Sequence, residues 1–182
     1  MTANISECNR TSFKFTFPSS GGLGIPHLRL AVFLACTGVI LLAALVVHSR
    51  GLWAPDELRY AQVVQGMDAA SDFFVLHLWG SVYTEKPPLF FWLARAAVPF
   101  TGAVNLTTLF VPVVLASCLL LWLTSAVAAR WYGVRAAILA VVVLLTLPLF
   151  LLLSSIGRMD MLLALSVTAA VAAFYRGYVD DC

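Results

Sequence analysis

Four stretches of the chain are long, apolar and almost free of charge, and this pattern constrains the fold more than any other feature. They are residues 28–47, 106–129, 136–153 and 158–177. A helix needs about 20 apolar residues, within a range of roughly 17–25, to cross the hydrocarbon core of a bilayer. The first three stretches meet this requirement. The fourth meets it only when Arg158, Asp160 and Arg176 at its ends are included.

The composition supports the same interpretation. The 182 residues are 62% hydrophobic and 11% charged, whereas a soluble domain carries roughly 25% charged residues. A soluble fold of this size could not bury so much apolar surface, but lipid solvates it. The sequence therefore predicts an all-α, polytopic membrane bundle of about four transmembrane helices. The net charge of +2 includes no Lys/Arg cluster, which argues against nucleic acid as a partner.

The cysteines and histidines predict no metal site. The four cysteines form no CxxC pair, so we expect neither a disulfide framework nor a zinc site from Cys8, Cys36, Cys118 and Cys182. His48 and His77 have no second ligand at helical spacing. The sequence leaves open whether a divalent cation takes part in function.

The positions of Lys and Arg predict the orientation, because cytoplasmic loops carry an excess of these residues. The loop 130–135 contains Arg130 and Arg135 and no acidic residue, so it is expected in the cytoplasm, together with a flexible lead over residues 1–27. The long loop 48–105 and the short loop 154–160 then lie on the periplasmic or extracytoplasmic side. The transmembrane region is expected to cover residues 28–178, followed by a truncated tail at 179–182.

Two segments of the long loop are expected to form helices in the membrane interface. Pro55 followed by Asp56 predicts the start of a helix that continues to Ala70, with Asp56 as its N-cap. Arg59 and Gln62 of this helix should face water. The Pro-Pro step at 87–88 predicts the start of a second helix over residues 89–100, since proline is tolerated in a first turn.

Three charged groups fall on the same side of the membrane under this topology. They are Asp56 with Arg59, Glu85 with Lys86, and Arg158 with Asp160. Ionisable residues at the bilayer edge are costly and tend to mark function. We therefore expect the three groups to converge on one site at the boundary between water and lipid.

The same segments resemble the motifs of a known family. Pro-Asp-Glu-Leu-Arg-Tyr-Ala at 55–61 resembles the PDExRYA motif of the GT-C glycosyltransferases, in the group of aminoarabinose-lipid A transferases and dolichyl-phosphate-mannose protein mannosyltransferases (glycosyltransferase family 39). Tyr-Thr-Glu-Lys-Pro-Pro-Leu-Phe-Phe-Trp-Leu at 83–93 resembles the YxEKPPLxYWL motif of that family. Arg-Met-Asp-Met at 158–161 is similar to a third motif, although Leu162 stands where proline is usual. The resemblance runs from Leu28 to Arg176 and implies a GT-C-like fold.

The resemblance implies a membrane glycosyltransferase. Such an enzyme moves a sugar from a polyprenyl-phosphate carrier to a lipid A, protein or glycan acceptor on the non-cytoplasmic face of the plasma (inner) membrane. Asp56 corresponds to the catalytic base, and Arg59 and Lys86 correspond to the contacts with the donor phosphate. The expected supporting residues are Glu57, Tyr60, Tyr83, Glu85, Arg158 and Asp160. Within this set, Glu57 and Glu85 are expected to hold the two cations, and Asp160 to orient the acceptor or a cation.

Structural alternatives exist for each residue. Asp56 would serve only as a helix cap, and Arg59 would extend to lipid headgroups. Glu85 and Lys86 would form an exposed ion pair worth ~0–1 kcal/mol. Asp160 would only end the fourth span. For the whole chain, the alternative is a truncated, non-catalytic multi-pass protein or interaction module, because family members have several hundred residues. We expect the 182-residue chain alone to be inactive. A transporter is disfavoured, because no paired charges lie in the middle of the membrane.

Overall fold

The structure is a computed structural model that describes residues 24–53, 55–67 and 73–180. The helices of the predicted spans are α1 (Ile25–Ser49), α4 (Leu106–Tyr132), α5 (Val134–Thr146), α6 (Pro148–Ser154) and α7 (Asp160–Asp180). Most of the predicted lead, residues 1–23, lies outside the described residues, and residues 25–27 belong to α1. The last two residues of the predicted tail also lie outside them.

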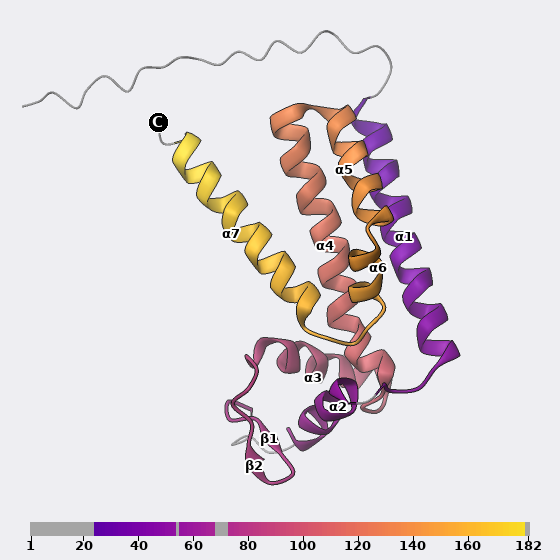
Figure 1. The fold of residues 1–182 in the computed structure, drawn as a ribbon, viewed down its shortest axis with the longest axis vertical. Helices are drawn as coiled ribbons and strands as arrows, with labels where there is room; N and C mark the ends of the chain where they lie inside the picture. Colours follow the sequence, from indigo (N-terminus) through magenta and orange to yellow (C-terminus); the bar gives the residue numbers. More distant parts are fainter. Residues whose placement is uncertain (1–23, 54, 68–72, 181–182) are drawn as a thin grey trace, which may run out of the picture.

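By length and composition, α1, α4 and residues 160–177 of α7 can each cross a membrane. The α5–α6 pair supplies a fourth span if the two helices are taken together. Figure 1 shows these helices as a bundle in which the chain runs alternately in opposite directions. The predicted all-α polytopic membrane fold is therefore confirmed.

The third predicted span is broken rather than straight. α5 and α6 meet at Leu147 with an angle of 68° between them. The residue before a proline is driven toward extended backbone, and Leu147 before Pro148 accordingly has φ −70° and ψ 117°. Proline suits the first turn of the next helix because it has no N–H to leave unpaired. This bend was not predicted from the sequence.

Helix α4 is the centre of the packing, since α1, α3, α5 and α7 all lie against it. Leu109, Val113 and Leu121 of α4 are fully buried. α1 and α7 instead expose many apolar side chains, such as Phe33 (67% exposed) and Phe174 (77% exposed). Outward apolar faces of this kind are stable in lipid and unfavourable in water.

The remaining elements gather at one end of the bundle, which we call the α2–α3 end. They are α2 (Asp56–Gly66), β1 (His77–Leu78), β2 (Ser81–Val82) and α3 (Leu89–Thr101). The connection between α6 and α7 reaches the same end (Figure 1). The antiparallel β1–β2 hairpin was not predicted. An aromatic cluster joins α2 to α3, with the Tyr60 ring 5.7 Å from Phe90 and 5.4 Å from Phe91 between centroids.

The two loop helices differ from their predictions in their ends. α3 starts at Leu89 as expected and ends one residue later, at Thr101. α2 ends at Gly66, earlier than the predicted Ala70, and residues 68–70 lie outside the described residues. The predicted N-cap is wrong by one position: Pro55 is the N-cap, and Asp56 is the first helical residue. The Asp56 carboxylate therefore does not cap the helix.

Candidate active site

Arg158 joins two carboxylates at the α2–α3 end of the bundle. Its Nη2 lies 3.3 Å from Oδ2 of Asp56, and its Nε lies 3.3 Å from Oδ2 of Asp160. The Nε approach to Asp160 satisfies the distance of an ion pair but not hydrogen-bond geometry, so among the described residues the Nε–H has no hydrogen-bond acceptor. One guanidinium thus links carboxylates from α2 and from the start of α7.

A cavity of about 520 Å³ opens beside this group. Its polar lining residues are Tyr60, Glu85, Lys86, Arg158 and Asp160. Its apolar lining includes Leu89 of α3 and Leu162 and Leu163 of α7. The cavity therefore combines two cations and two carboxylates with apolar side chains.

Arg158 is also part of a second, smaller cavity of about 230 Å³. This cavity is lined by Trp53, Asp56, Glu57 and Arg158, among others. Arg158 therefore lines both cavities, whereas Asp56 lines only the smaller one and Lys86 and Asp160 line only the larger one. In the part of the chain that the structure describes, no group of three or more His, Cys, Asp and Glu side chains could hold a metal ion.

Two tyrosines at the site remain neutral phenols. Burial, and then the negative charge of Asp56, raise the pKa of Tyr60 to about 12. Burial and the charge of Glu85 raise the pKa of Tyr83, while Arg59 acts in the opposite direction. A protonated phenol can donate a hydrogen bond to a bound anion.

Arg59 is near enough to Tyr83 for its charge to act on that phenol, but it is not part of the two cavities. It is exposed on α2, as the sequence predicted. The structure brings Asp56, Lys86, Arg158 and Asp160 together from three segments of the chain. Arg158, expected only as a supporting residue, takes the central position instead of Arg59.

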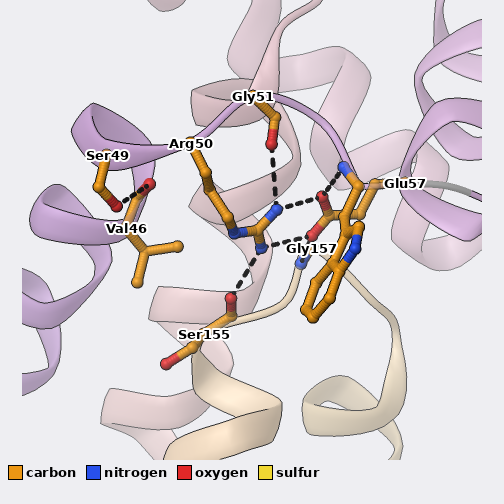
Figure 2. A network of polar contacts seen from close by, with 8 residues as sticks. Val46, Ser49, Arg50, Gly51, Glu57, Ser155 and Gly157 are labelled. Carbon is orange, nitrogen blue, oxygen red and sulfur yellow. Dashed lines mark hydrogen bonds and ion pairs between the residues drawn. The ribbon is translucent and has the colours of Figure 1, made fainter.

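The prediction that Glu57 holds Arg59 is wrong, because Glu57 pairs with Arg50. Oε2 of Glu57 accepts hydrogen bonds from Arg50 Nη1 and the Trp53 N–H, both at 2.7 Å. Oε1 accepts from Arg50 Nη2 at 2.9 Å and from the Gly157 N–H at 2.8 Å. Figure 2 shows this network, in which Arg50 also donates to the Ser155 carbonyl at 3.0 Å.

The Glu57 carboxylate is charged although its side chain is only 1% exposed. Burial by itself raises its pKa, but the hydrogen bonds from Arg50, Gly157 and Trp53 outweigh burial and lower the pKa overall. The hydrogen bond with Glu57 in turn raises the pKa of Arg50. A buried charge is tolerable only when it is paired and its hydrogen-bonding capacity is used, and both conditions hold here.

Arg50 and Gly157 were not predicted as site residues. Arg50 follows the first predicted span directly, and no motif includes it. Gly157 gave no signal, because a contact between residues 57 and 157 has no periodic pattern. Glycine fits closely there, since an added Cβ would lie 3.1 Å from Cβ of Leu109 and 3.5 Å from Oε1 of Glu57.

We expect Gly157→Ala to lower the melting temperature. The added methyl forces Leu109 or the loop to shift, and overpacking of this kind costs about 1–3 kcal/mol. Thermal unfolding in detergent, followed by tryptophan fluorescence, measures the change. The matched control is Gly38→Ala in α1, where the added Cβ meets nothing within 4 Å. Equal melting temperatures for the two variants would contradict the close contact at Gly157.

The fold and the site define an integral, all-helical, multi-pass membrane protein with a charged cavity at one end of its bundle. The family model described as dolichyl-phosphate-mannose-protein mannosyltransferase matches residues 85–181, more than half of the chain. The chain belongs to this family. The family expected from the sequence is therefore confirmed.

Similar proteins carry more specific names. The chain is 34% identical over 154 residues (84% of its length) to undecaprenyl phosphate-alpha-4-amino-4-deoxy-L-arabinose arabinosyl transferase 1 of Sodalis glossinidius. It is 34% identical over 131 residues (70% of its length) to the transferase of Edwardsiella ictaluri that bears the same name without the final numeral. It spans about a quarter of the length of these curated relatives, 26% and 23% respectively.

A solved structure has a similar fold. The crystal structure of ArnT from Cupriavidus metallidurans bound to undecaprenyl phosphate matches with a TM-score of 0.72 and 26% sequence identity. The match covers 83% of this chain and 28% of that one. The GT-C-like architecture expected from the sequence is thereby confirmed.

Proposed function

We propose that this chain carries the catalytic motifs of a membrane glycosyltransferase that uses a polyprenyl-phosphate sugar as donor and a lipid, protein or glycan hydroxyl or phosphate as acceptor. One observation carries the proposal: carboxylates and cations line the same cavity as a set of apolar side chains. That combination suits a ligand with a phosphate head and a hydrocarbon tail. Support also comes from the names of the arabinosyl transferases and from the ArnT structure bound to undecaprenyl phosphate.

The proposed reaction is a direct displacement at the anomeric carbon. Asp56 takes the proton of the acceptor hydroxyl as the acceptor oxygen forms a bond to that carbon. The bond from carbon to the phosphate oxygen breaks, and the lipid phosphate leaves with the electron pair. Cations placed where charge develops favour the transition state over the ground state. Lys86 and Arg158 supply these charges from the cavity, Arg59 approaches from the water side, and Asp160 orients the acceptor.

The activity is tested on the full-length protein purified in detergent. The substrates are undecaprenyl-phosphate aminoarabinose as donor and lipid A as acceptor, with product detected by mass spectrometry. We expect sugar transfer that requires the lipid-phosphate donor, and no transfer from a nucleotide sugar. A panel of other undecaprenyl-phosphate sugars and of peptide or glycan acceptors extends the test. If no combination gives product, the non-catalytic interaction module is favoured.

We propose that the site lies on the periplasmic side of the inner membrane. Arg130 and Arg135 lie at the end of α4 and the start of α5, at the end of the bundle opposite α2 and α3 (Figure 1). An excess of Arg and Lys marks the cytoplasmic side of a membrane protein.

Cysteine accessibility in whole cells checks this orientation. We expect Gln62→Cys, on the exposed face of α2, to react with a membrane-impermeant maleimide added from outside. Tyr132→Cys, at the α4–α5 turn, should react only after the inner membrane is permeabilised. The reverse pattern would contradict the proposed orientation.

A further inference from the structure

The two halves of the candidate site come from distant parts of the chain. Asp56 belongs to the first turn of α2, while Arg158 and Asp160 belong to the connection between α6 and α7 and the start of α7. The direct ion pair between Asp56 and Arg158 is a weak tie, because its side chains are 34% and 38% exposed. Exposed ion pairs contribute little to holding structure in place. A stronger tie is needed to keep the two halves in one geometry.

Buried contacts made by the residues next to Asp56 and Arg158 in the sequence supply that tie. Glu57 follows Asp56, Gly157 precedes Arg158, and the Glu57 carboxylate accepts the Gly157 N–H at 2.8 Å. Arg50 strengthens the connection from the end of α1, because its guanidinium bonds both Glu57 oxygens and the Ser155 carbonyl (Figure 2). Three segments of the chain therefore meet on one buried carboxylate.

We propose that Glu57, with Arg50 and Gly157, is the positioning group that fixes Asp56 relative to Arg158 for the transfer reaction. We call the contacts among these three residues the Glu57 latch. The assignment rests on the proposed function, and it makes Glu57 a residue that acts through its neighbours rather than on the substrate. Reacting groups must be held closely, since a misplacement of about 1 Å can lower a rate by roughly 10²-fold.

The hydrogen-bond donors around Glu57 explain why a glutamate side chain occupies this position. Each oxygen receives two hydrogen bonds, one from Arg50 and one from a backbone N–H of Trp53 or Gly157. Glutamine would turn an NH2 group toward one of these N–H donors, so one backbone N–H would lose its acceptor. Aspartate keeps the charge but is one methylene shorter and cannot reach both sides. We therefore expect kcat to be highest with Glu at this position, lower with Asp and lowest with Gln.

The first test measures geometry without activity. Spin labels at Gln62 of α2 and Val167 of α7, both exposed, report the distance between the halves by double electron–electron resonance, in a full-length background without native cysteines. We expect the distance distribution to broaden or shift in Glu57→Gln and, to a smaller extent, in Glu57→Asp and Arg50→Lys. A label pair at Leu119 of α4 and Leu139 of α5 should not change. An unchanged Gln62–Val167 distribution in all three variants would overturn the latch.

The second test measures turnover of the same variants. We expect Glu57→Gln to lower kcat by on the order of 10²-fold, with KM for the carrier-linked sugar within about threefold of the parent. The matched control is Arg29→Lys, an exposed arginine near the other end of α1, which should leave kcat unchanged. If Glu57→Gln does not fold, Glu57→Asp and Arg50→Lys carry both tests.

The two tests together distinguish a failure of the Glu57 latch from a failure of the proposed function. A changed distance together with a reduced kcat supports the positioning role. A changed distance with parental kcat would show that the latch is structural only, and the positioning role would be overturned. A parent protein without any transferase activity would refute the proposed function, and the distance measurement would still decide whether the latch joins the two halves.

Discussion

Asp56→Asn in the full-length protein is expected to lower kcat by about 10²- to 10⁴-fold, the range for loss of a positioned general base. Asparagine keeps the shape of the side chain but cannot accept the acceptor proton. The structure also argues that stability will change little. The N-cap of α2 is Pro55, Asp56 makes no capping hydrogen bond, and its partly exposed pair with Arg158 is worth only ~0–1 kcal/mol.

Steady-state kinetics with the carrier-linked sugar, together with the melting temperature, checks this prediction. The matched control is Gln65→Ala, which removes an exposed polar side chain from the same helix. If Asp56 contributed only its partly exposed ion pair with Arg158, both quantities would stay near the parent values. Near-normal kcat in Asp56→Asn would therefore remove Asp56 as the base.

Lys86→Gln should have the second-largest effect, a loss of about 10²- to 10³-fold in kcat/KM for the donor. That is the usual range when one group that stabilises developing negative charge is removed. Lys86 lines the same cavity as Arg158, so the leaving phosphate would lose one of its two cations there. Lys86→Arg keeps the charge and should recover part of the loss.

The effect of Lys86→Gln is measured by kinetics and by binding of undecaprenyl phosphate to the purified protein. Arg176→Gln is the control, because Arg176 is exposed near the end of α7 distant from the site. If Lys86 and Glu85 formed only an exposed ion pair, Lys86→Gln would behave like this control. Parental kcat/KM and parental lipid binding would exclude Lys86 as a phosphate contact.

Spans and interfacial helices could be predicted from local patterns. Hydropathy marks α1 and α4 directly, because a bilayer demands long uncharged segments. The start of α3 follows from the Pro-Pro step at 87–88. The convergence of Asp56, Lys86 and Asp160 followed from topology, since an even number of crossings returns the chain to the same side.

Contacts between distant segments could not be predicted in the same way. Glu57 and Gly157 are 100 positions apart in the sequence. No periodic pattern connects a residue at the start of a helix with a loop that follows two further spans. The motif around 55–61 identified Glu57 but suggested Arg59 as the cation that it holds. On α2, however, Glu57 points into the protein and Arg59 points to water.

The bend at Leu147 determines how far into the bilayer the loop 155–159 can sit. α5 has 13 residues, and a rise of about 1.5 Å per residue gives it a length of about 20 Å. The hydrocarbon core is about 30 Å thick, and α6 adds little height because it turns away from the α5 axis by 68°. Measured along the α5 axis, the α5–α6 pair is therefore shorter than the hydrocarbon core is thick. If α5 starts at the opposite boundary of that core, Arg158 and Asp160 lie on the lipid side of the headgroup level rather than in bulk water. A phosphate anchored by a hydrocarbon tail reaches that level without leaving its own leaflet.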